Sequence, residues 1–443
     1  MTDAPKTPSR RWLLAGGAAA AGALTLAACG RKSESAAASA EGKAALPSGA
    51  FAEGKGPEVT GAKLGFIALT DCSPLIVAKE KGLFAKYGLP DVEVLKQASW
   101  GATRDNLVLG SAAGGIDGAH ILTPMPYLLT TGQATGGKPT PMYILARLNL
   151  NGQAISIGND LKALSVGLDA SAAKARFAEL KAKGKPSQVA MTFRGGTHDL
   201  WLRYWLAAGG VHPDKDVSTI VIPPPQMVAN LKAGTQDAFC VGEPWNGQTV
   251  NQQIGYSACV TSELWMDHPE KALGLRADWV DKNPIAAKAL LMAVQEAQQW
   301  CDPVENREEM CRIVSGRQWI NVPLADILPR QLGEIDYGSG RVEKASAHVM
   351  KFWRNDASFP FKSHDLWFLT EDQRWGVLPA SLDARALVDK VNRSDLWREA
   401  AAAIGAAAPA GDSRGRETFF DGKVFDPDNP KAWLDAQPIK SLA

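Results

Sequence analysis

The chain is 443 residues long, with 45% hydrophobic and 21% charged residues, a composition typical of a globular protein with room for two core-bearing lobes. Its 48 basic and 47 acidic side chains nearly cancel, so the formal net charge is only +1. A broad basic face of the kind that binds phosphate backbones is therefore not expected, and we exclude nucleic acid as a partner.

The N-terminal residues have the pattern of an export signal. Arg10 and Arg11 precede a short apolar stretch that ends in Leu26-Ala27-Ala28-Cys29. This stretch is too short to span a membrane comfortably, and its small-residue end is typical of cleavage. The arginine pair resembles a twin-arginine signal, and the residues before Cys29 resemble a bacterial lipobox. We predict an export signal over residues 1–28 and lipidation of Cys29; an uncleaved N-terminal anchor is the alternative.

Residues 29–58 are rich in Ala, Ser, Gly, Lys and Glu, which predicts a flexible tether behind the lipidated cysteine. No later segment has the roughly 20 apolar residues that a membrane-spanning helix needs. The body is therefore expected to be periplasmic or otherwise extracytoplasmic, and to be held at the membrane by the lipid at Cys29.

Helices and strands alternate through the body, which predicts an α/β fold. Residues 59–150 contain predicted strands at 63–69, 92–95 and 118–122, with helices at 76–87 and 102–109, and further strands within 142–158 cross the boundary at residue 150. Residues 151–245 form a second α/β module, with strands predicted at 164–169, 187–193, 217–225 and 236–245 and helices at 172–184, 194–208 and 226–234. Return strands within 246–275 and helices at 285–300, 305–315 and 379–391 follow.

A nested α/β module predicts two lobes that are joined by two crossovers and enclose a ligand cleft. We assign residues 59–150 and 246–443 to lobe 1 with a C-terminal extension, and residues 151–245 to lobe 2. In open parallel sheets the ligand binds outside the carboxyl ends of the strands. Strand-to-helix junctions are therefore the candidate walls of the cleft.

One such junction is "RGGTHDLWLRYW" at residues 194–205. Thr197 or His198 is predicted to N-cap the helix, with Asp199 in its first turn and an apolar face behind it. The free N–H groups and the positive dipole end of this helix could face an anion. The same pattern also fits an ordinary capped helix that binds nothing.

Four other residues are candidates for the same cleft. Trp100 and Gly101 stand at a second strand-to-helix junction, where the indole N–H could donate into the cleft or the ring could pack in the core. Gln153 lies near the crossover and could be a ligand contact or a satisfied strand amide. Lys271, in "HPEKALGLR", would by its spacing alone be a solvated lysine.

Cysteine and histidine spacing argues against a metal. No CxxC is present, and the six histidines never pair at the spacing of a zinc site. Besides Cys29 the chain has an odd number of cysteines, so at least one thiol is free or bonded between molecules. We expect no metal and no cofactor.

Several long motifs resemble the nitrate/nitrite/bicarbonate-binding proteins of bacterial ABC importers. The likeness covers about residues 60–400 and includes "KGLFAKYGLPDVEVLKQASWGATRDN", "FRGGTHDLWLRYWLAAGG", "DAFCVGEPWN" and "HPEKALGLRADW". It implies a type II periplasmic-binding-protein fold and a ligand held by Trp100, Gln153, His198 and Lys271. Nitrate-specific members have lysine at the last position and bicarbonate-specific members an acidic residue, so the resemblance implies the nitrate branch.

The chemistry of the two anions agrees with that choice. Nitrate has no proton to give and suits a ring of donors closed by a cation, whereas bicarbonate needs at least one acceptor. The direction of the neighbouring Glu270 side chain cannot be read from the sequence.

We therefore expect a lipid-anchored solute-binding protein, not an enzyme, that captures nitrate and nitrite and delivers them to an ABC permease and its ATPase. The alternatives are a bicarbonate- or other small-anion-binding protein, a nitrate sensor that partners a regulator, which the export signal opposes, and a secreted enzyme. No HExxH motif or zinc-site spacing supports the enzyme.

Overall fold

The computed structural model describes residues 55–442. The predicted export signal, Cys29 and the tether up to residue 54 lie outside the described residues. Glu58, in the last part of the predicted tether, is already attached to the body, because its carboxylate accepts hydrogen bonds from the N–H groups of Ile285 (3.0 Å) and Ala286 (2.8 Å). The folded body therefore begins before residue 59.

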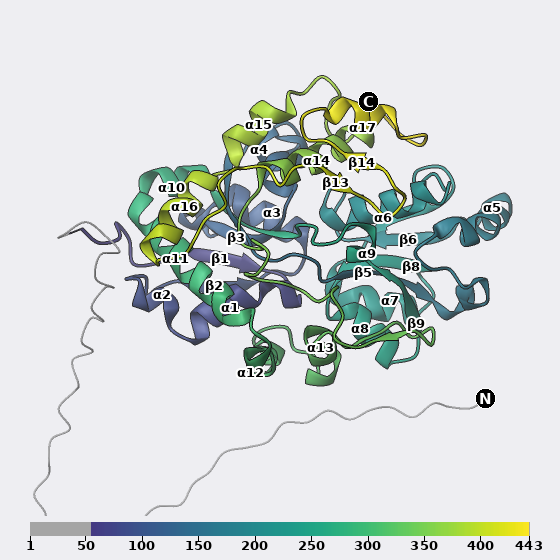
Figure 1. Cartoon of the computed structure of the whole chain (residues 1–443), viewed down its shortest axis with the longest axis horizontal. Coiled ribbons are helices and arrows are strands. Elements are labelled where there is room, and N and C mark those ends of the chain that lie inside the picture. Colours follow the sequence, from purple (N-terminus) through teal and green to yellow (C-terminus); the bar gives the residue numbers. More distant parts are fainter. Residues whose placement is uncertain (1–54, 443) are drawn as a thin grey trace, which may run out of the picture. The chain divides into compact units, whose positions relative to one another are not determined.

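The first lobe is built on a five-stranded sheet with the order β2-β1-β3-β10-β4. β1, β2 and β3 are parallel, and β10 runs antiparallel between β3 and β4. Helices cover the sheet (Figure 1), which explains the almost continuous burial of its central strands. The elements are β1 (Lys63–Phe66), α1 (Ser73–Glu80), α2 (Leu83–Lys86), β2 (Glu93–Lys96), α3 (Trp100–Leu109), β3 (Gly118–Leu122), α4 (Met125–Thr131), β4 (Met142–Arg147), β10 (Lys271–Arg276), α10 (Ala277–Lys282) and α11 (Pro284–Cys301).

The second lobe repeats this arrangement in the order β7-β6-β8-β5-β9. β6, β7 and β8 are parallel, and β5, which arrives from the first lobe, is antiparallel to β8 and β9. Each sheet thus contains one strand that enters directly from the other lobe. The elements are β5 (Gln153–Gly158), α5 (Lys174–Ala182), β6 (Gln188–Met191), α6 (Thr197–Ala208), β7 (Ser218–Val221), α7 (Met227–Lys232), β8 (Ala238–Gly242), α8 (Trp245–Asn251), β9 (Gly255–Val260) and α9 (Thr261–Leu264).

Three details differ from the sequence prediction. The second lobe does not end at residue 245, because β9 pairs with β5 and the chain returns to the first sheet only with β10. The strand predicted at 164–169 is absent; 3₁₀ turns at Asn159–Leu164 and Ala170–Ala173 occupy the region, with Ser165 at φ +49°. The helix predicted at 76–87 is broken at Gly82, whose φ of +69° is left-handed.

The C-terminal extension, which the sequence analysis grouped with lobe 1, contacts both lobes. Asp365 on α14 forms an ion pair with Arg147 of β4 in the first lobe. Trp367, on the same helix, stacks on Trp201 of α6 in the second lobe at 5.0 Å. Figure 1 shows the last segments, in yellow, above both sheets. The elements are α12 (Val304–Ser315), α13 (Leu324–Gln331), β11 (Ile335–Asp336), β12 (Val342–Glu343), α14 (Lys362–Arg374), α15 (Ala384–Val391), α16 (Ser394–Ala403), β13 (Glu417–Thr418), β14 (Val424–Phe425) and α17 (Pro430–Asp435).

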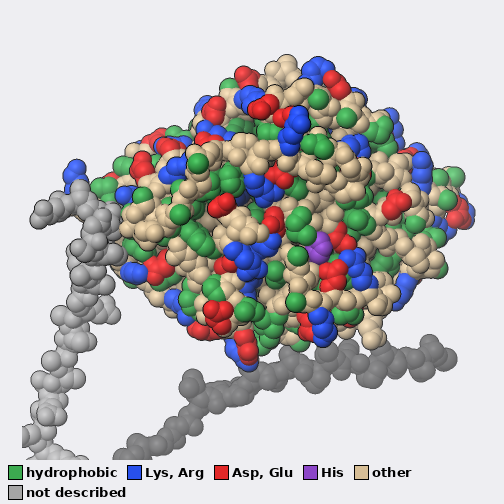
Figure 2. Space-filling view, viewed as in Figure 1, with side chains coloured by type: hydrophobic (Ala, Val, Ile, Leu, Met, Phe, Trp, Pro, Cys, Tyr) green, Lys and Arg blue, Asp and Glu red, His purple; other side chains and the backbone are tan. Residues whose placement is uncertain are grey.

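The cysteines and the surface complete the description. Cys72, Cys240, Cys259, Cys301 and Cys311 are all buried and all unpaired. None of the helices within residues 55–442 combines the length and the apolar character needed to cross a membrane. Acidic and basic side chains are interspersed over the face drawn in Figure 2.

Candidate functional site

The four side chains that the family resemblance singled out come together between the lobes. Trp100 is the first residue of α3 and His198 lies in the first turn of α6, so both follow the carboxyl end of a parallel strand. Gln153 and Lys271 are the first residues of β5 and β10, the strands that enter each sheet from the other lobe. All four are buried. This is the place where an open α/β fold binds its ligand.

His198 is held as a neutral ring by two neighbours. Its Nε2 lies 2.7 Å from Oε1 of Gln153, and its Nδ1 lies 2.6 Å from Oγ1 of Thr192. Because an amide oxygen can only accept, Nε2 carries the proton and Nδ1 accepts from the threonine hydroxyl. Burial, with the nearby charge of Lys271, lowers the pKa of His198 well below its ordinary value. The ring is therefore an N–H donor without a positive charge.

Lys271 provides the charge of the site. Its Nζ lies 2.8 Å from Oε1 of Glu270, 2.9 Å from Oδ2 of Asp71 and 3.5 Å from Nε2 of His198. The ammonium also lies 5.9 Å from the centroid of the Trp100 ring. Burial by itself would lower the pKa of Lys271, but the two carboxyl groups outweigh it and the pKa is raised. The side chain is not the solvated lysine that its spacing alone suggested.

Asp71 and His120 belong to this cluster, and sequence reasoning missed both. Asp71 follows β1 in a 3₁₀ turn, and its carboxylate contacts Nε2 of His120 at 2.6 Å and Nε2 of Gln153 at 3.1 Å. Burial opposes ionisation of Asp71, yet the charge of Lys271 and the contacts with His120 keep its pKa below the ordinary value. The position of Asp71 just after a buried strand was the one signal that could have found it.

Glu270 points into the cluster. Its Oε1 accepts hydrogen bonds from Oγ1 of Thr197 and from Nζ of Lys271, and lies 3.3 Å from Nε2 of His198. Burial, with the charge of Asp71, raises the pKa of Glu270 even against the opposing effect of Lys271. The direction of Glu270, which the sequence left open, is therefore inward, and two carboxyl groups surround the ammonium.

Thr197 does not cap α6, contrary to the prediction that it or His198 is the N-cap. Gly196 is the N-cap residue, and Thr197 is the first residue of the helix. The Thr197 hydroxyl is engaged by Glu270 instead, and the carboxylate of Asp199 accepts a hydrogen bond from the N–H of Gly195. The helix start is thus tied to the site through a side chain rather than through a cap.

Two glycines in the region differ in their constraints. Gly101, predicted to contact ligand, is half-buried in α3, and a Cβ there would meet only Oγ of Ser99 at an ordinary 3.6 Å. At Gly242, the end of β8, a Cβ would lie 2.9 Å from Oε1 of Gln153 and 3.2 Å from Oδ2 of Asp71. A side chain at 242, a position that sequence reasoning did not identify, would therefore displace the Gln153 amide, whereas one at 101 would meet no close contact.

The indole of Trp100 contributes a free donor. Its Nε1 is buried and has no hydrogen-bond partner. An indole N–H can only donate, so a ligand that offers an acceptor would satisfy it. The ring lies 5.5 Å from that of His120, which fixes it beside the ammonium of Lys271. One free donor and one cation, both buried, form a site suited to a small anion.

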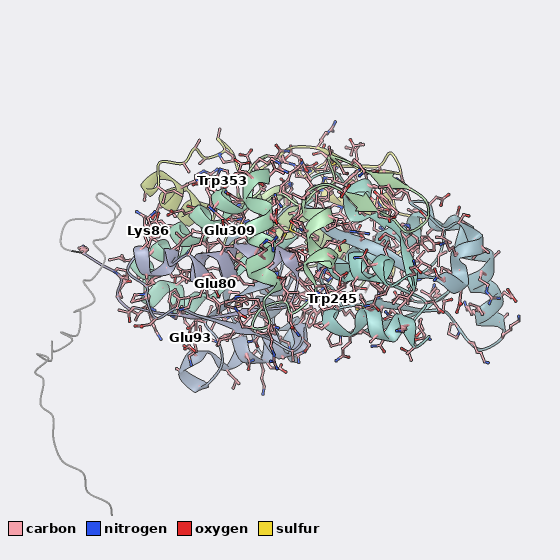
Figure 3. All side chains as sticks on the ribbon, turned by 90° about the horizontal axis from the view of Figure 1, so that it is seen from below. Glu80, Lys86, Glu93, Trp245, Glu309 and Trp353 are labelled. Carbon is pink, nitrogen blue, oxygen red and sulfur yellow. The ribbon has the colours of Figure 1, made fainter. Side chains whose placement is uncertain are left out.

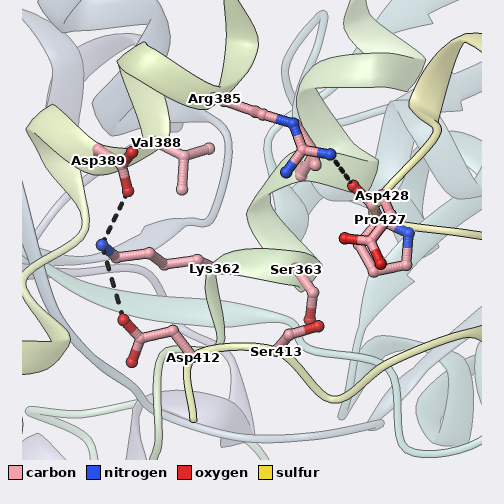
Figure 4. Close-up of a pocket in the computed structure, with 10 residues that line it drawn as sticks. Lys362, Ser363, Arg385, Val388, Asp389, Asp412, Ser413, Pro427 and Asp428 are labelled. Carbon is pink, nitrogen blue, oxygen red and sulfur yellow. Dashed lines mark hydrogen bonds and ion pairs between the residues drawn. The ribbon is translucent and has the colours of Figure 1, made fainter.

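A cavity elsewhere has less to offer a ligand. It has a volume of about 270 Å³ and lies between α14, α15 and the C-terminal loop (Figure 4). Lys362 pairs there with Asp389 at 2.8 Å and Asp412 at 3.7 Å, and Arg385 donates to the carbonyl of Pro427. None of its lining side chains has a buried polar atom without a partner, in contrast to Trp100. Within the described residues no group of three potential ligands could hold a metal ion.

Two α/β lobes that exchange strands and enclose a buried polar site define the two-lobed periplasmic-binding-protein class. Residues 55–315 match the NMT1-like family. The chain is 60% identical to the nitrate/nitrite binding protein NrtA of Synechocystis sp., covering 100% of both chains. The crystal structure of the periplasmic nitrate-binding protein NrtA from Synechocystis PCC 6803 superposes with a TM-score of 0.85, at 65% identity, over 87% of this chain and 100% of that one.

Two further relatives have other names and lower identities to this chain. The bicarbonate-binding protein CmpA of Synechococcus elongatus is 46% identical over 86% of this chain and 88% of its own length. The nitrate import ATP-binding protein NrtC of Synechocystis sp. is 37% identical over 87% of this chain, which corresponds to 56% of its own length. The chain belongs to the nitrate/nitrite- and bicarbonate-binding proteins of bacterial ABC importers. It is a solute-binding protein and not an enzyme.

Proposed function

We propose that the chain captures nitrate, and also nitrite, between its two lobes. The observation that carries this proposal is the buried, unpartnered indole N–H of Trp100 beside the charged ammonium of Lys271. His198 adds an uncharged N–H, and Gln153 can turn its amide toward a ligand. Four residues that supply N–H donors suit a small planar anion that only accepts hydrogen bonds.

Bicarbonate is the second candidate, and one observation favours it. Asp71 and Glu270 place carboxyl groups beside the ammonium, and bicarbonate needs an acceptor for its own proton. Lysine at position 271 and the higher identity to nitrate-binding relatives, 60% against 46%, favour nitrate.

Calorimetric titration of the chain with nitrate, nitrite, bicarbonate and sulfate tests the proposal. Nitrate and nitrite should bind, whereas bicarbonate and sulfate should bind at least about tenfold more weakly, a difference of about 1.4 kcal/mol. Tighter binding of bicarbonate than of nitrate would reverse the assignment.

We further propose that the protein delivers its anion to an ABC permease and its ATPase. The 37% identity to an ATP-binding nitrate import protein supports a partner of this kind. Uptake of labelled nitrate by cells that lack this protein should fall, and should return when the intact gene is supplied. Unchanged uptake would argue against delivery.

Export and lipid anchoring at Cys29 belong to the same proposal. They rest on Arg10, Arg11 and the residues before Cys29. Replacing Cys29 by Ser should abolish lipidation and the cleavage that depends on it, and replacing both arginines by Lys should retain the protein in the cytoplasm. Processing and location like those of the parent in both variants would contradict the targeting proposal.

A further inference from the structure

The carboxyl group of Glu270 has one satisfied and one unsatisfied oxygen. Its Oε1 accepts from Thr197 and Lys271, whereas its Oε2 is buried and has no partner. A buried carboxylate oxygen without a donor is costly. A protonated carboxyl group at the same place would instead carry a donor of its own.

The charges around the site favour protonation of Glu270 once an anion binds. Lys271 contributes one positive charge, and Asp71, held ionised by Lys271 and His120, cancels it. An ionised Glu270 together with nitrate would then leave two uncompensated negative charges among buried side chains. Protonation of Glu270 removes one of them and supplies a donor that nitrate can accept.

We propose that Glu270 takes up one proton when nitrate binds and that its Oε2–H donates a hydrogen bond to the anion. The inference rests on the proposed nitrate function and adds a linkage to pH. The proton comes from the solvent and returns to it when the lobes separate and the anion leaves. Glu270 is thereby a specificity residue, because bicarbonate, which brings its own proton, would prefer the ionised form.

The other titratable groups around Glu270 do not change charge in the neutral range. Burial lowers the pKa values of His198 and His120, and burial raises that of Cys240. The pKa of Lys271 is raised by its carboxylate partners and that of Asp71 is lowered by Lys271, in each case against the effect of burial. Glu270 is the member of this cluster whose pKa is moved toward neutrality.

Calorimetric titration of the full-length chain with nitrate from about pH 5 to pH 10, in buffers with different ionisation enthalpies, tests the proposal. Above the pKa of Glu270 in the free protein, nitrate should bind with uptake of about one proton, and its affinity should fall about tenfold for each pH unit. The proton count comes from the parent protein, so it does not depend on any variant folding correctly.

Glu270→Gln provides the matched variant, because the amide is a permanent donor that cannot titrate. Its nitrate affinity should vary by less than about twofold over this range, and at high pH it should bind more tightly than the parent. Glu309→Gln on α12, where the side chain is 59% exposed, should keep the pH dependence of the parent.

Three outcomes would overturn the inference. Nitrate binding by the parent with constant affinity and no proton uptake would refute it and leave the proposed function intact. Loss of nitrate binding on addition of EDTA would indicate that a cation, and not a proton, compensates the carboxyl groups. Absence of nitrate binding at every pH would refute the proposed function itself, and this inference with it.

Discussion

The ammonium group of Lys271 lies 2.9 Å from Oδ2 of Asp71, and neither side chain is exposed to solvent. Removing two charges from water is expensive, so each partner depends on the other. The ion pair joins the first residue of β10 to the turn that follows β1, and Gln153 from the second lobe donates to the same carboxylate. Charge, fold stability and ligand binding are therefore coupled at this point.

Replacing Lys271 by Ala should weaken both nitrate binding and the fold. Loss of a charge-assisted hydrogen bond of about 1.5 to 3 kcal/mol should lower affinity roughly ten- to a hundredfold. The uncompensated Asp71 should lower the free energy of unfolding by about 3 to 5 kcal/mol. Calorimetry and urea unfolding measure the two effects.

The double variant Asp71→Asn/Lys271→Ala separates them, because removal of the buried carboxylate should recover stability but not binding. Lys232→Ala, on an exposed lysine of α7, is the control and should change neither quantity by more than about 0.5 kcal/mol. Nitrate binding by Lys271→Glu as tight as that of the parent would remove the main support for nitrate.

Trp100→Phe should weaken nitrate binding while leaving the packing largely intact. Phenylalanine keeps an aromatic ring beside His120 but loses the indole N–H, the free donor of the site. The expected loss is about 1.5 to 3 kcal/mol of binding free energy, measured by calorimetry. Trp319→Phe is the control, since its indole N–H donates to Glu80, outside the site. Equal affinities for Trp100→Phe and the parent would show that this N–H faces no ligand.

The lobes should move apart to admit the anion and close on it. The site residues are buried, and contacts hold the lobes together: the N–H of Thr70 donates to the carbonyl of Glu243 at 2.7 Å, and Nε1 of Trp245 (labelled in Figure 3) donates to the carbonyl of Ala68 at 3.0 Å. Small-angle scattering should therefore give a smaller radius of gyration with saturating nitrate. An unchanged profile, with binding verified in the same sample, would contradict closure.

Asp372 should make the fold less stable as pH rises. The side chain on α14 is buried, both carboxyl oxygens lack partners, and burial with the charges of Asp199 and Glu371 raises its pKa well above the ordinary value. A raised folded-state pKa stabilises the fold fully below the unfolded pKa of about 4, and this contribution is lost as pH rises toward the folded value.

At pH 8, Asp372→Asn should accordingly have a free energy of unfolding about 1 to 3 kcal/mol higher than that of the parent, as measured by urea unfolding. This difference should be smaller at pH 5. Asp105→Asn, where the side chain is 64% exposed, is the matched control and should show little of this pH dependence. A difference between Asp372→Asn and the parent that stays constant with pH would show that Asp372 does not titrate in this way.

The sequence alone was enough to predict the two-lobed α/β fold and the cluster of Trp100, Gln153, His198 and Lys271. Local sequence patterns were enough to predict the fold, since buried strands and helix ends are indicated by residues that are neighbours in the sequence. The prediction that these four side chains form the site came from the family resemblance, because the spacing of Lys271 alone indicated a surface lysine. Trp100 and His198 follow the carboxyl ends of parallel strands, and Gln153 and Lys271 begin the antiparallel strands at the same sheet edges.

Only the tertiary structure decided which other groups join them. Asp71 and Lys271 are 200 residues apart in the chain, and the inward direction of Glu270 depends on where the crossover enters the sheet. Helix α14 is buried on all sides because both lobes pack around it, so its sequence has no apolar stripe from which the helix could have been predicted. Long-range packing creates these environments, because segments distant in the sequence exclude water from the charged groups of Lys271 and Asp71.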